Sequence, residues 1–194
     1  MKKIIIYGDG GHAKSCLDLV ISTNNFKVIG FISKDKQKIG KEIYGHKIIG
    51  SDRDLPKLLK LTDNLIFGIS FIYDLKKRKK LFNKLLSLGF KFPKIISKNS
   101  YISKYSKISE GVNIFHSCVI GPGVNIGIGT VINNFSLVEH DVKIGNNCHI
   151  STSNTINGST VIGDNTFVGS GSIIVNNKKI QKNTFIKIGS IIKK

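Results

Sequence analysis

The chain has 194 residues, with 30 Lys or Arg against 12 Asp or Glu, so its formal charge at pH 7 is +18. Its 40% hydrophobic content is enough to form a buried core, which excludes a wholly disordered chain. No apolar run approaches the roughly 18 residues that a membrane-spanning helix needs, and the first run is interrupted at Gly8, so we expect a soluble, cytoplasmic protein without membrane insertion. The three cysteines are scattered, which disfavours both a disulfide framework and a structural metal site.

The positive charge is unevenly distributed along the chain. Residues 108–177 contain one basic residue, Lys143, and the whole chain has two arginines, Arg53 and Arg78. Proteins that read nucleic acids depend on clustered charge and on guanidinium groups that hydrogen-bond bases and phosphates. We therefore disfavour a nucleic-acid partner and expect a lysine-rich surface that attracts small polyanions such as nucleotides and coenzyme A.

The chain opens with a predicted strand at residues 3–7, a glycine-rich turn and a predicted helix at residues 14–21. Glycines after a strand permit a tight turn, allow backbone N–H groups to approach a phosphate, and leave the N-terminus of the following helix facing the anion. The pattern predicts a phosphate site, with an ordinary strand-to-helix turn as the alternative. The turn residues are Gly8, Gly10, Gly11 and His12.

Strands and helices continue to alternate through the first half. A second strand is predicted at residues 27–32, and Asp35 follows it at the distance where an acidic residue meets a ribose hydroxyl. About 95 residues form half of a doubly wound unit, which suits one nucleotide better than a dinucleotide. We therefore expect residues 1–95 to form a nucleotide-binding α/β domain. Its further predicted elements are a helix near residues 51–61, a strand at 64–69 and a helix at 74–88.

The second half has a period of six residues. From residue 102 to residue 192 every sixth residue is Ile or Val, and the residue four places later is small or β-branched except at Asn154 and Lys178. A helix has a period of 3.6 and a simple strand a period of 2, so neither explains this repeat. It is typical of a parallel β-helix, in which each hexad forms one flat face and the Ile and Val side chains stack inside. We therefore expect a β-helix over residues 96–194.

One histidine has the surroundings of a general base. His140 is the histidine with a carboxylate on both sides, Glu139 and Asp141, and it lies at an outward position two residues after the inward Val138. A carboxylate that holds one ring nitrogen fixes the tautomer and leaves the other nitrogen free to accept a proton. Neighbours on a strand point to opposite sides, so at most one of the two acids can readily contact the ring without help from a turn or a neighbouring chain. The spacing leaves both acids open as candidates.

Two features carry a resemblance to a known family. Hexads such as Ile-Gly-Pro-Gly-Val-Asn at 120–125 and Val-Ile-Gly-Asp-Asn-Thr-Phe-Val-Gly at 161–169 resemble those of the hexapeptide-repeat acyltransferases. Together with the Gly-x-Gly-Gly-His start at 8–12, they make nearly the whole chain similar to the sialic acid O-acetyltransferase group, which includes bacterial amino-sugar-nucleotide N-acetyltransferases such as the bacillosamine-pathway enzyme. The resemblance implies a left-handed, triangular β-helix with three hexads per coil. It also implies a homotrimer that binds acetyl-CoA in the groove between neighbouring β-helices.

The resemblance assigns roles to individual residues. The segment around His140 carries the general base, and Asn133 and His149 match positions that line the acceptor and thioester site. Gly158 lies one coil beyond His140 and, as a glycine, leaves room for the pantetheine arm of acetyl-CoA. Arg78 matches an arginine that opens a helix, although it also fits a solvated run of charges. The residues implied to bind the nucleotide sugar are Gly8, Gly10, Gly11, His12, Asp35 and Arg78.

The sequence therefore predicts an acetyltransferase that moves acetyl from acetyl-CoA to the amino group of a nucleotide-linked amino sugar, with UDP as the expected nucleotide. O-acetylation of sialic acid or a related sugar uses the same base and stays open. A non-catalytic nucleotide-binding scaffold also stays open, because the Gly-x-Pro-Ala tail found near coenzyme A in relatives is missing. No metal is expected, since His116, His140 and His149 do not fall in one stacked column as zinc ligands on this fold would.

Overall fold

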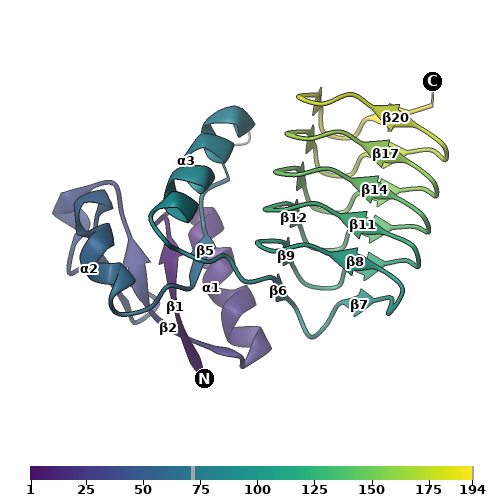
Figure 1. Cartoon of the computed structure of the whole chain (residues 1–194). Coiled ribbons are helices and arrows are strands. Elements are labelled where there is room, and N and C mark those ends of the chain that lie inside the picture. Colours follow the sequence, from purple (N-terminus) through teal and green to yellow (C-terminus); the bar gives the residue numbers. More distant parts are fainter. Residues whose placement is uncertain (71–72, 194) are drawn as a thin grey trace. The chain divides into compact units, whose positions relative to one another are not determined.

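The structure, a computed structural model, describes residues 1–70 and 73–193 (Figure 1). By its internal contacts the chain divides into two units. The first unit is Met1–Ser70 with Lys80–Pro93, and the second is Phe71–Lys79 with Lys94–Lys194. From the sequence, one domain boundary was expected, after residue 95. In the structure the short segment 71–79 groups with the second unit, although it lies well before that boundary.

The first unit is built on a five-stranded sheet in the order β3-β4-β2-β1-β5. β1, β2, β4 and β5 are parallel, and β3 pairs antiparallel with β4. Ile4, Ile5 and Ile6 of β1 are fully buried, as expected for a β-branched run in an inner strand covered on both faces. The strands are β1 (Lys2–Tyr7), β2 (Phe26–Ile32), β3 (Glu42–Ile43), β4 (His46–Gly50) and β5 (Leu65–Phe67).

The helices that were predicted for this half are present with different bounds. The region predicted as one helix at 51–61 is a short 3-10 helix followed by α2, because Ser51 and Asp54 form a capping box and Pro56 suits the first turn of a helix. The β3–β4 hairpin was not predicted. Its two turn residues, Tyr44 and Gly45, both have positive φ, as a two-residue hairpin requires. The helices are α1 (Gly11–Thr23), η1 (Lys36–Lys38), η2 (Asp52–Asp54), α2 (Leu55–Leu59) and α3 (Leu75–Ser87).

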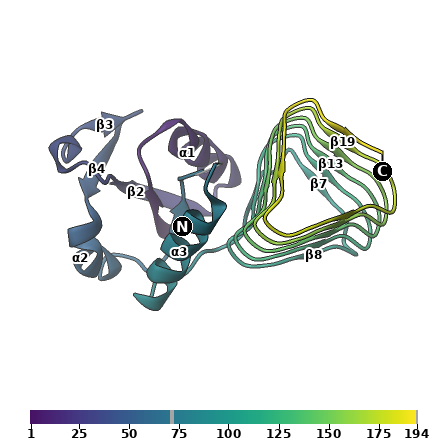
Figure 2. The same ribbon diagram turned by 90° about the horizontal axis from the view of Figure 1, so that it is seen from above.

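The second unit is a parallel β-helix, as predicted, and its two-residue strands form three sheets that appear as the sides of a triangle in Figure 2. Each strand pairs in register with the strand 18 residues along the chain. Face 1 consists of β7 (Tyr101–Ile102), β10 (Val119–Ile120), β13 (Leu137–Val138), β16 (Thr155–Ile156), β19 (Ile173–Ile174) and β22 (Ile191–Ile192). Face 2 consists of β8 (Lys107–Ile108), β11 (Asn125–Ile126), β14 (Lys143–Ile144), β17 (Val161–Ile162) and β20 (Lys179–Ile180). Face 3 consists of β6 (Ile95–Ile96), β9 (Asn113–Ile114), β12 (Val131–Ile132), β15 (His149–Ile150), β18 (Phe167–Val168) and β21 (Phe185–Ile186).

The stacked Ile and Val residues form the core of this unit. Most of the second inward set is also buried, and its hydroxyl groups are hydrogen-bonded; for example, Thr130 Oγ1 donates to the Gly145 carbonyl at 2.8 Å. Asn154, which interrupts the second set, is accommodated in the same way. Its Nδ2 donates to the Ser151 carbonyl at 2.8 Å, and its Oδ1 accepts from the Ser172 N–H at 2.9 Å. A buried amide is tolerated here because its hydrogen bonds are made.

The corners explain why the repeat has six residues. The third residue after nearly every inward Ile or Val has a positive φ, which turns the chain from one face to the next. Faces 1 and 2 meet at the His140 corner, faces 3 and 1 at the Phe135 corner, and faces 2 and 3 at the asparagine corner. The left-handed residues are Gly123, Asp141, Ser159 and Asn177 at the His140 corner, Ser117, Phe135, Ser153, Gly171 and Gly189 at the Phe135 corner, and Gly111, Gly129, Asn147, Asn165 and Asn183 at the asparagine corner.

All three cysteines, Cys16, Cys118 and Cys148, are reduced and buried. Burial raises the pKa of the Cys118 thiol and raises that of Cys148 to about 11. Across the described residues no helix is both long and apolar enough to cross a membrane. No group of three or more His, Cys, Asp or Glu side chains in the same residues is arranged to hold a metal ion.

Candidate active site

His140 lies exposed at its corner and is paired with Asp141. The distance from His140 Nδ1 to Asp141 Oδ2 is 2.9 Å, and the two side chains are 54% and 66% exposed. Adjacent residues face each other here because Asp141 has a φ of 60°, which breaks the alternation of the strand. Glu139 instead donates its backbone N–H to the Ile156 carbonyl within the sheet. Of the two acids that the sequence left open, Asp141 therefore makes the contact with the imidazole.

Glycines in the two neighbouring coils make space for this pair. A Cβ on Gly123, one coil before, would overlap Asp141 Oδ1. A Cβ on Gly158, one coil after, would lie 2.5 Å from His140 Nε2 and 2.6 Å from Cε1. The expected space beside Gly158 is thus occupied by the imidazole itself, rather than left free for a pantetheine arm. Both glycines fix where the His140–Asp141 pair can lie.

Asn133 and His149 lie on other parts of the β-helix. Asn133 precedes the Phe135 corner, and its Oδ1 accepts from the Asn134 N–H at 2.9 Å. His149 belongs to β15 on face 3, opposite the His140 corner, and is 4% exposed. One chain therefore does not bring Asn133 or His149 together with His140.

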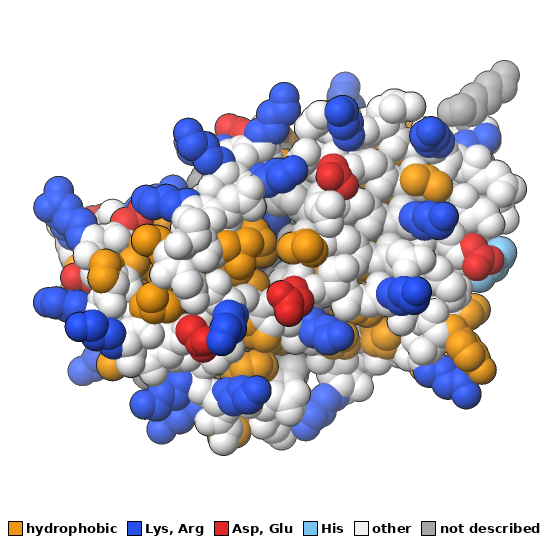
Figure 3. All heavy atoms as spheres, viewed as in Figure 1, with side chains coloured by type: hydrophobic (Ala, Val, Ile, Leu, Met, Phe, Trp, Pro, Cys, Tyr) orange, Lys and Arg blue, Asp and Glu red, His pale blue; other side chains and the backbone are white. Residues whose placement is uncertain are grey.

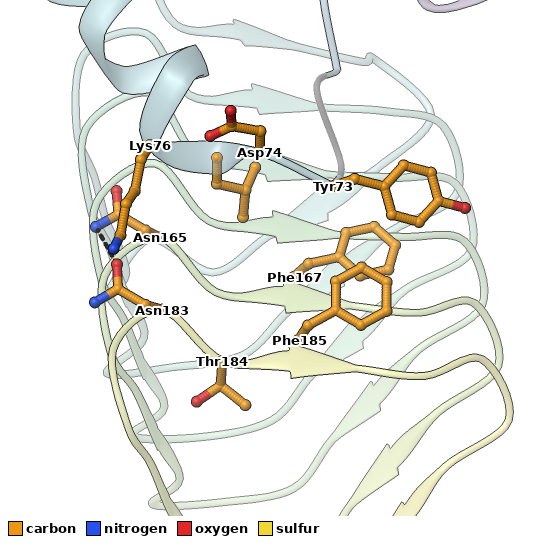
Figure 4. A pocket seen from close by; sticks show the side chains of 9 residues that line it. Tyr73, Asp74, Lys76, Asn165, Phe167, Asn183, Thr184 and Phe185 are labelled. Carbon is orange, nitrogen blue, oxygen red and sulfur yellow. Dashed lines mark hydrogen bonds between the residues drawn. The ribbon is translucent and has the colours of Figure 1, made fainter.

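A column of aromatic rings extends from His149 along face 3. The ring centroids of His149 and Phe167 are 5.6 Å apart, those of Phe167 and Phe185 are 4.7 Å apart, and those of Phe185 and Tyr73 are 5.9 Å apart. A hollow of about 160 Å³ lies beside this column (Figure 4). It is lined by Tyr73, Asp74, Leu75, Lys76, Asn165, Phe167, Asn183, Thr184 and Phe185. This hollow was not predicted from the sequence, because residues 73–76 were expected to belong to the first unit.

Arg78 is a buried part of the second unit and is 1% exposed. Its Nη1 donates to the Gly129 carbonyl at 2.9 Å and to Asn147 Oδ1, and Asn147 Nδ2 donates to the Leu75 carbonyl at 2.8 Å. These bonds fasten the first turn of α3 to the asparagine corner. The sequence predicted that Arg78 contacts a nucleotide sugar, or else that it is a solvated surface charge. In the structure Arg78 is instead buried and hydrogen-bonded to the β-helix. A ligand reaches this guanidinium only if the contact opens.

The glycine turn of the first unit contains three glycines. Packing requires a glycine at Gly8, whereas Gly10 and Gly11 have room for a side chain. Gly8 has a φ of +124°, and a Cβ there would lie 2.8 Å from the Gly68 carbonyl oxygen. Gly10 and Gly11 face open space, with nothing within 4 Å of an added Cβ. Gly10 is also the N-cap of α1, where no side chain caps the helix and no acidic residue lies in the first turn. The half-buried His12 follows in that first turn.

A pocket of about 340 Å³ adjoins this turn. Asp9 Oδ2 accepts from Ser33 Oγ at 3.0 Å and from Lys38 Nζ at 2.7 Å. Partial burial raises the pKa of Asp9, but the hydrogen bonds from Lys38 and Ser33 outweigh it and hold this pKa below its usual value. The lining residues are Asp9, Lys14, Lys38, Lys41, Glu42, Ile43, Tyr44 and Ile48.

Asp35, the acid that was expected to meet a ribose, is not among the residues that line this pocket. It is exposed, and its Oδ1 accepts from the Gln37 N–H at 2.9 Å as the cap of η1. The acid at the pocket is Asp9, which lies inside the glycine turn itself. Asp9 was visible in the sequence as a member of that turn, whereas Lys38 and Lys41 looked like any other members of a lysine-rich segment.

Comparison with known protein families identifies the first half of the chain. Residues 3–85 match the family model of the PglD N-terminal domain. The chain contains a PglD N-terminal domain. This domain carries the glycine turn and the lysine-lined pocket described above. The resemblance that was identified from the sequence is thereby confirmed for this half.

Solved structures match the fold of the whole chain. A histidine-to-asparagine mutant of perosamine N-acetyltransferase from Caulobacter crescentus, in complex with CoA and GDP-perosamine, has a TM-score of 0.92 at 24% identity over 100% of this chain and 90% of its own. The acetyltransferase domain of PglB from Neisseria gonorrhoeae in complex with acetyl coenzyme A has a TM-score of 0.85 at 21% identity over 98% and 92%. At these identities the likeness shows the fold alone, an α/β domain followed by a β-helix.

Proposed function

We propose that the chain is an acetyl-CoA-dependent acetyltransferase that acts on the amino group of a nucleotide-linked amino sugar. The main support for this proposal is the exposed His140–Asp141 pair, which lies between glycines of the two adjacent coils. Two structures of the same fold support the choice of substrates, since one holds CoA with GDP-perosamine and the other holds acetyl coenzyme A. The perosamine enzyme acts on nitrogen, which favours an amine over a hydroxyl as the acceptor here.

His140 acts as the general base in this proposal. Because its Nδ1 faces the Asp141 carboxylate, Nδ1 carries the hydrogen and Nε2 carries the lone pair. Nε2 takes a proton from the amine as the amine nitrogen bonds to the thioester carbonyl carbon. The carbon–sulfur bond then breaks, and His140 returns the proton to the departing thiolate. Asp141 stabilises the imidazolium that forms between these two transfers.

The PglD N-terminal domain would hold the nucleotide sugar at its glycine turn. Gly10 and Gly11 leave space over the uncapped N-terminus of α1, where backbone N–H groups and the helix dipole favour a phosphate. Lys14, Lys38 and Lys41 add positive charge at the adjoining pocket. We expect a nucleoside diphosphate to bind here, with UDP and GDP as the two nucleotides to compare.

The acetyl site would be shared between copies of the chain. Asn133 and His149 are expected at the acceptor and thioester site, yet they lie on different parts of the β-helix from His140. A site that uses all three needs a second copy, which agrees with the homotrimer that the resemblance implies. Mixing His140→Asn and Asn133→Ala proteins tests this, since mixed assemblies would then regain turnover that neither variant has alone.

Release of the coenzyme A thiol from acetyl-CoA, measured with UDP- and GDP-linked amino sugars and with sialic acid, tests the function. His140→Asn is expected to lower kcat by about 10²–10⁴-fold, the usual contribution of a general base. Asp141→Asn should lower kcat by a smaller factor, and asparagine tolerates the left-handed backbone at this position. His46→Asn, at a half-buried histidine of the β3–β4 hairpin, is the control and should retain activity.

Each outcome decides between the candidate functions. Turnover with an amino sugar that is lost in His140→Asn supports the proposal. Turnover with sialic acid alone would make the protein an O-acetyltransferase. Binding of coenzyme A and nucleotide without turnover on any acceptor would contradict the enzymatic function and favour a scaffold.

A further inference from the structure

The hollow beside the ring column has an aromatic wall and a polar wall (Figure 4). Phe167, Phe185 and Tyr73 form the aromatic wall, and Asn165 and Asn183 lie on the polar side. All of the lining residues belong to the second unit, so one unit supplies the whole hollow. A few polar groups set against aromatic side chains are the usual lining of a small-molecule site. The proposed function does not use this hollow.

The aromatic wall is open to solvent at one end. Phe167 is 5% exposed, whereas Phe185 is 48% and Tyr73 is 86% exposed. The rings of Phe185 and Tyr73 are stacked, with an angle of 19° between their planes. The face of an aromatic ring is negative and attracts the positive hydrogens of C–H groups. The two exposed rings therefore offer a platform for a ligand surface that is rich in C–H groups.

The polar wall is held in place by the asparagine corner. Asn147 donates to Asn165 Oδ1 at 3.0 Å, and Asn165 donates to Asn183 Oδ1 at 3.2 Å. Asn147 is also bonded to the Leu75 carbonyl, which ties this ladder to the first turn of α3. Asn183 is the last amide of the ladder in the described chain and is exposed, so its Nδ2 can donate to a ligand. Groups that are fixed before binding lose little entropy when a ligand arrives.

The charges around the hollow favour a neutral ligand. Two of its nine lining residues are charged, Asp74 and Lys76, and their charges have opposite signs. Lys and Arg side chains are spread over the surface that is seen in Figure 3, and the pocket of the first unit has three lysines against two acids. A phosphate is therefore attracted more strongly to other parts of this chain than to the hollow.

A pyranose ring has the features that this lining can recognise. One face of such a ring consists of C–H groups, and its edge has hydroxyl groups that donate and accept hydrogen bonds. Asp74 Oδ1 accepts from the Lys77 N–H at 2.8 Å, and Oδ2 makes no hydrogen bond within the described residues, so it can accept from a hydroxyl. The hollow of about 160 Å³ is smaller than the roughly 300 Å³ at which pockets for whole ligands begin, so it suits a single ring.

We propose that the hollow binds a pyranose ring, with Phe185 and Tyr73 as the platform for its C–H face and Asn183 and Asp74 as hydrogen-bond partners at its edge. The inference deepens the proposed function and rests on it for one source of the ring, the sugar of the nucleotide-linked acceptor. A sugar unit of a glycan presents the same ring and is the other source. Binding at the hollow can be tested without turnover.

Saturation-transfer difference NMR detects a sugar that lies on an aromatic side chain, because saturation of the protein's aromatic protons reaches the C–H protons of the bound ring. The probes are methyl glucosaminide for the ring alone, UDP-glucosamine for the nucleotide-linked ring and UMP for the nucleotide alone. We expect saturation transfer to the ring of methyl glucosaminide. Phe185→Leu and Tyr73→Ala should each weaken its binding roughly three- to tenfold, the usual worth of an aromatic contact, and Phe185→Tyr should bind as the wild type does.

Tyr101→Leu is the matched control, because Tyr101 is an exposed aromatic residue at an outward strand position of face 1. It should bind the sugar as tightly as the wild type, and thermal unfolding shows whether each variant is folded. The proposal would be overturned by a wild type that shows no saturation transfer to either sugar ring. Equal sugar binding by the wild type and Phe185→Leu would also overturn it, as would UMP binding that depends on Phe185.

The two sugars separate the two sources of the ring. Binding of the UDP-glucosamine ring that needs Phe185 would support the acceptor as the source, and Phe185-dependent binding of methyl glucosaminide alone would support a glycan unit. Sugar binding that needs Phe185, without thiol release on any acceptor, would support the site and count against the proposed function. Thiol release and sugar binding that are both unchanged in Phe185→Leu would do the reverse.

Discussion

The asparagine corner and the His140 corner use the same left-handed backbone position, yet one is closed by hydrogen bonds and the other is open. At the asparagine corner, Asn147 Nδ2 donates to Asn165 Oδ1 at 3.0 Å and Asn165 Nδ2 donates to Asn183 Oδ1 at 3.2 Å, so each side chain is held by the next coil. At the His140 corner, the left-handed residue of the next coil is Ser159, the residue under the His140 ring is Gly158, and the polar pair stays exposed. The repeat sets the backbone, and the residues one coil away decide whether a corner is structural or chemical.

The sharpest test of this comparison replaces one glycine near each corner. Gly158→Ala places a methyl group against the His140 ring, which is exposed and can swing away. Gly145→Ala places a methyl group 2.7 Å from the backbone nitrogen of Asp164, and this backbone atom cannot move aside. We expect Gly158→Ala to lower turnover by about 100-fold, as misplacement of a catalytic group does, with little change in Tm. Gly145→Ala should lower the free energy of unfolding by about 1–3 kcal/mol, the usual cost of overpacking.

Thiol-release kinetics and thermal unfolding, measured on both variants, give the answer. Equal losses of stability would mean that the His140 corner is as tightly packed as the interior coils. Full activity in Gly158→Ala would mean that the observed position of the imidazole is not the catalytic one.

A second test removes the arginine that fastens the first turn of α3 to the asparagine corner within the second unit. Arg78→Met leaves the Gly129 carbonyl and the Asn147 amide without their buried donor, and unmet buried hydrogen bonds cost about 1–3 kcal/mol. Lys79→Met changes the exposed neighbour on the same helix and should alter stability by less than about 0.5 kcal/mol. Urea unfolding measures both. Equal stability of the two variants would contradict a structural role for Arg78.

The smallest effect concerns the ion pair at the pocket of the first unit. The pKa of Asp9 lies below its usual value, so Asp9 stabilises the folded chain above the usual aspartate pKa of about 4 and loses this effect as pH falls through its folded pKa. Asp9→Asn should therefore lower Tm slightly at pH 7, and the difference from the wild type should shrink as pH falls below about 4. Glu42→Gln, at another carboxylate of the pocket, should produce a smaller difference. A Tm difference for Asp9→Asn that is constant over this range would show that the charge is not its cause.

The β-helix was predictable because one physical requirement repeats every six residues. An inward branched side chain must fill each coil, and a residue that tolerates positive φ must follow at the corner. Phe135 is the corner residue that this rule does not predict. The separation of His140 from His149 was also readable, since nine residues are half of an 18-residue coil and so place the two histidines on opposite sides.

Other parts of the site depend on long-range packing that the sequence does not encode locally. Asp141 rather than Glu139 contacts the base because of a single backbone angle. In the sequence Arg78 looks like one of the basic residues around it. Its burial depends on hydrogen bonds to Gly129 and Asn147, which lie 51 and 69 positions further along the chain. The β3–β4 hairpin, which brings Tyr44 to the pocket, has strands too short to give a clear pattern.

The buried cysteines have a practical consequence for these experiments. Thiol reagents attack the thiolate, and burial keeps Cys118 and Cys148 protonated at assay pH and shielded from solvent, as it shields Cys16. The folded protein therefore adds little background when such a reagent counts the coenzyme A that is set free. For the same reason Ser159→Cys, at the exposed position beside Gly158, would provide one addressable attachment point for a fluorescent reporter of ligand occupancy.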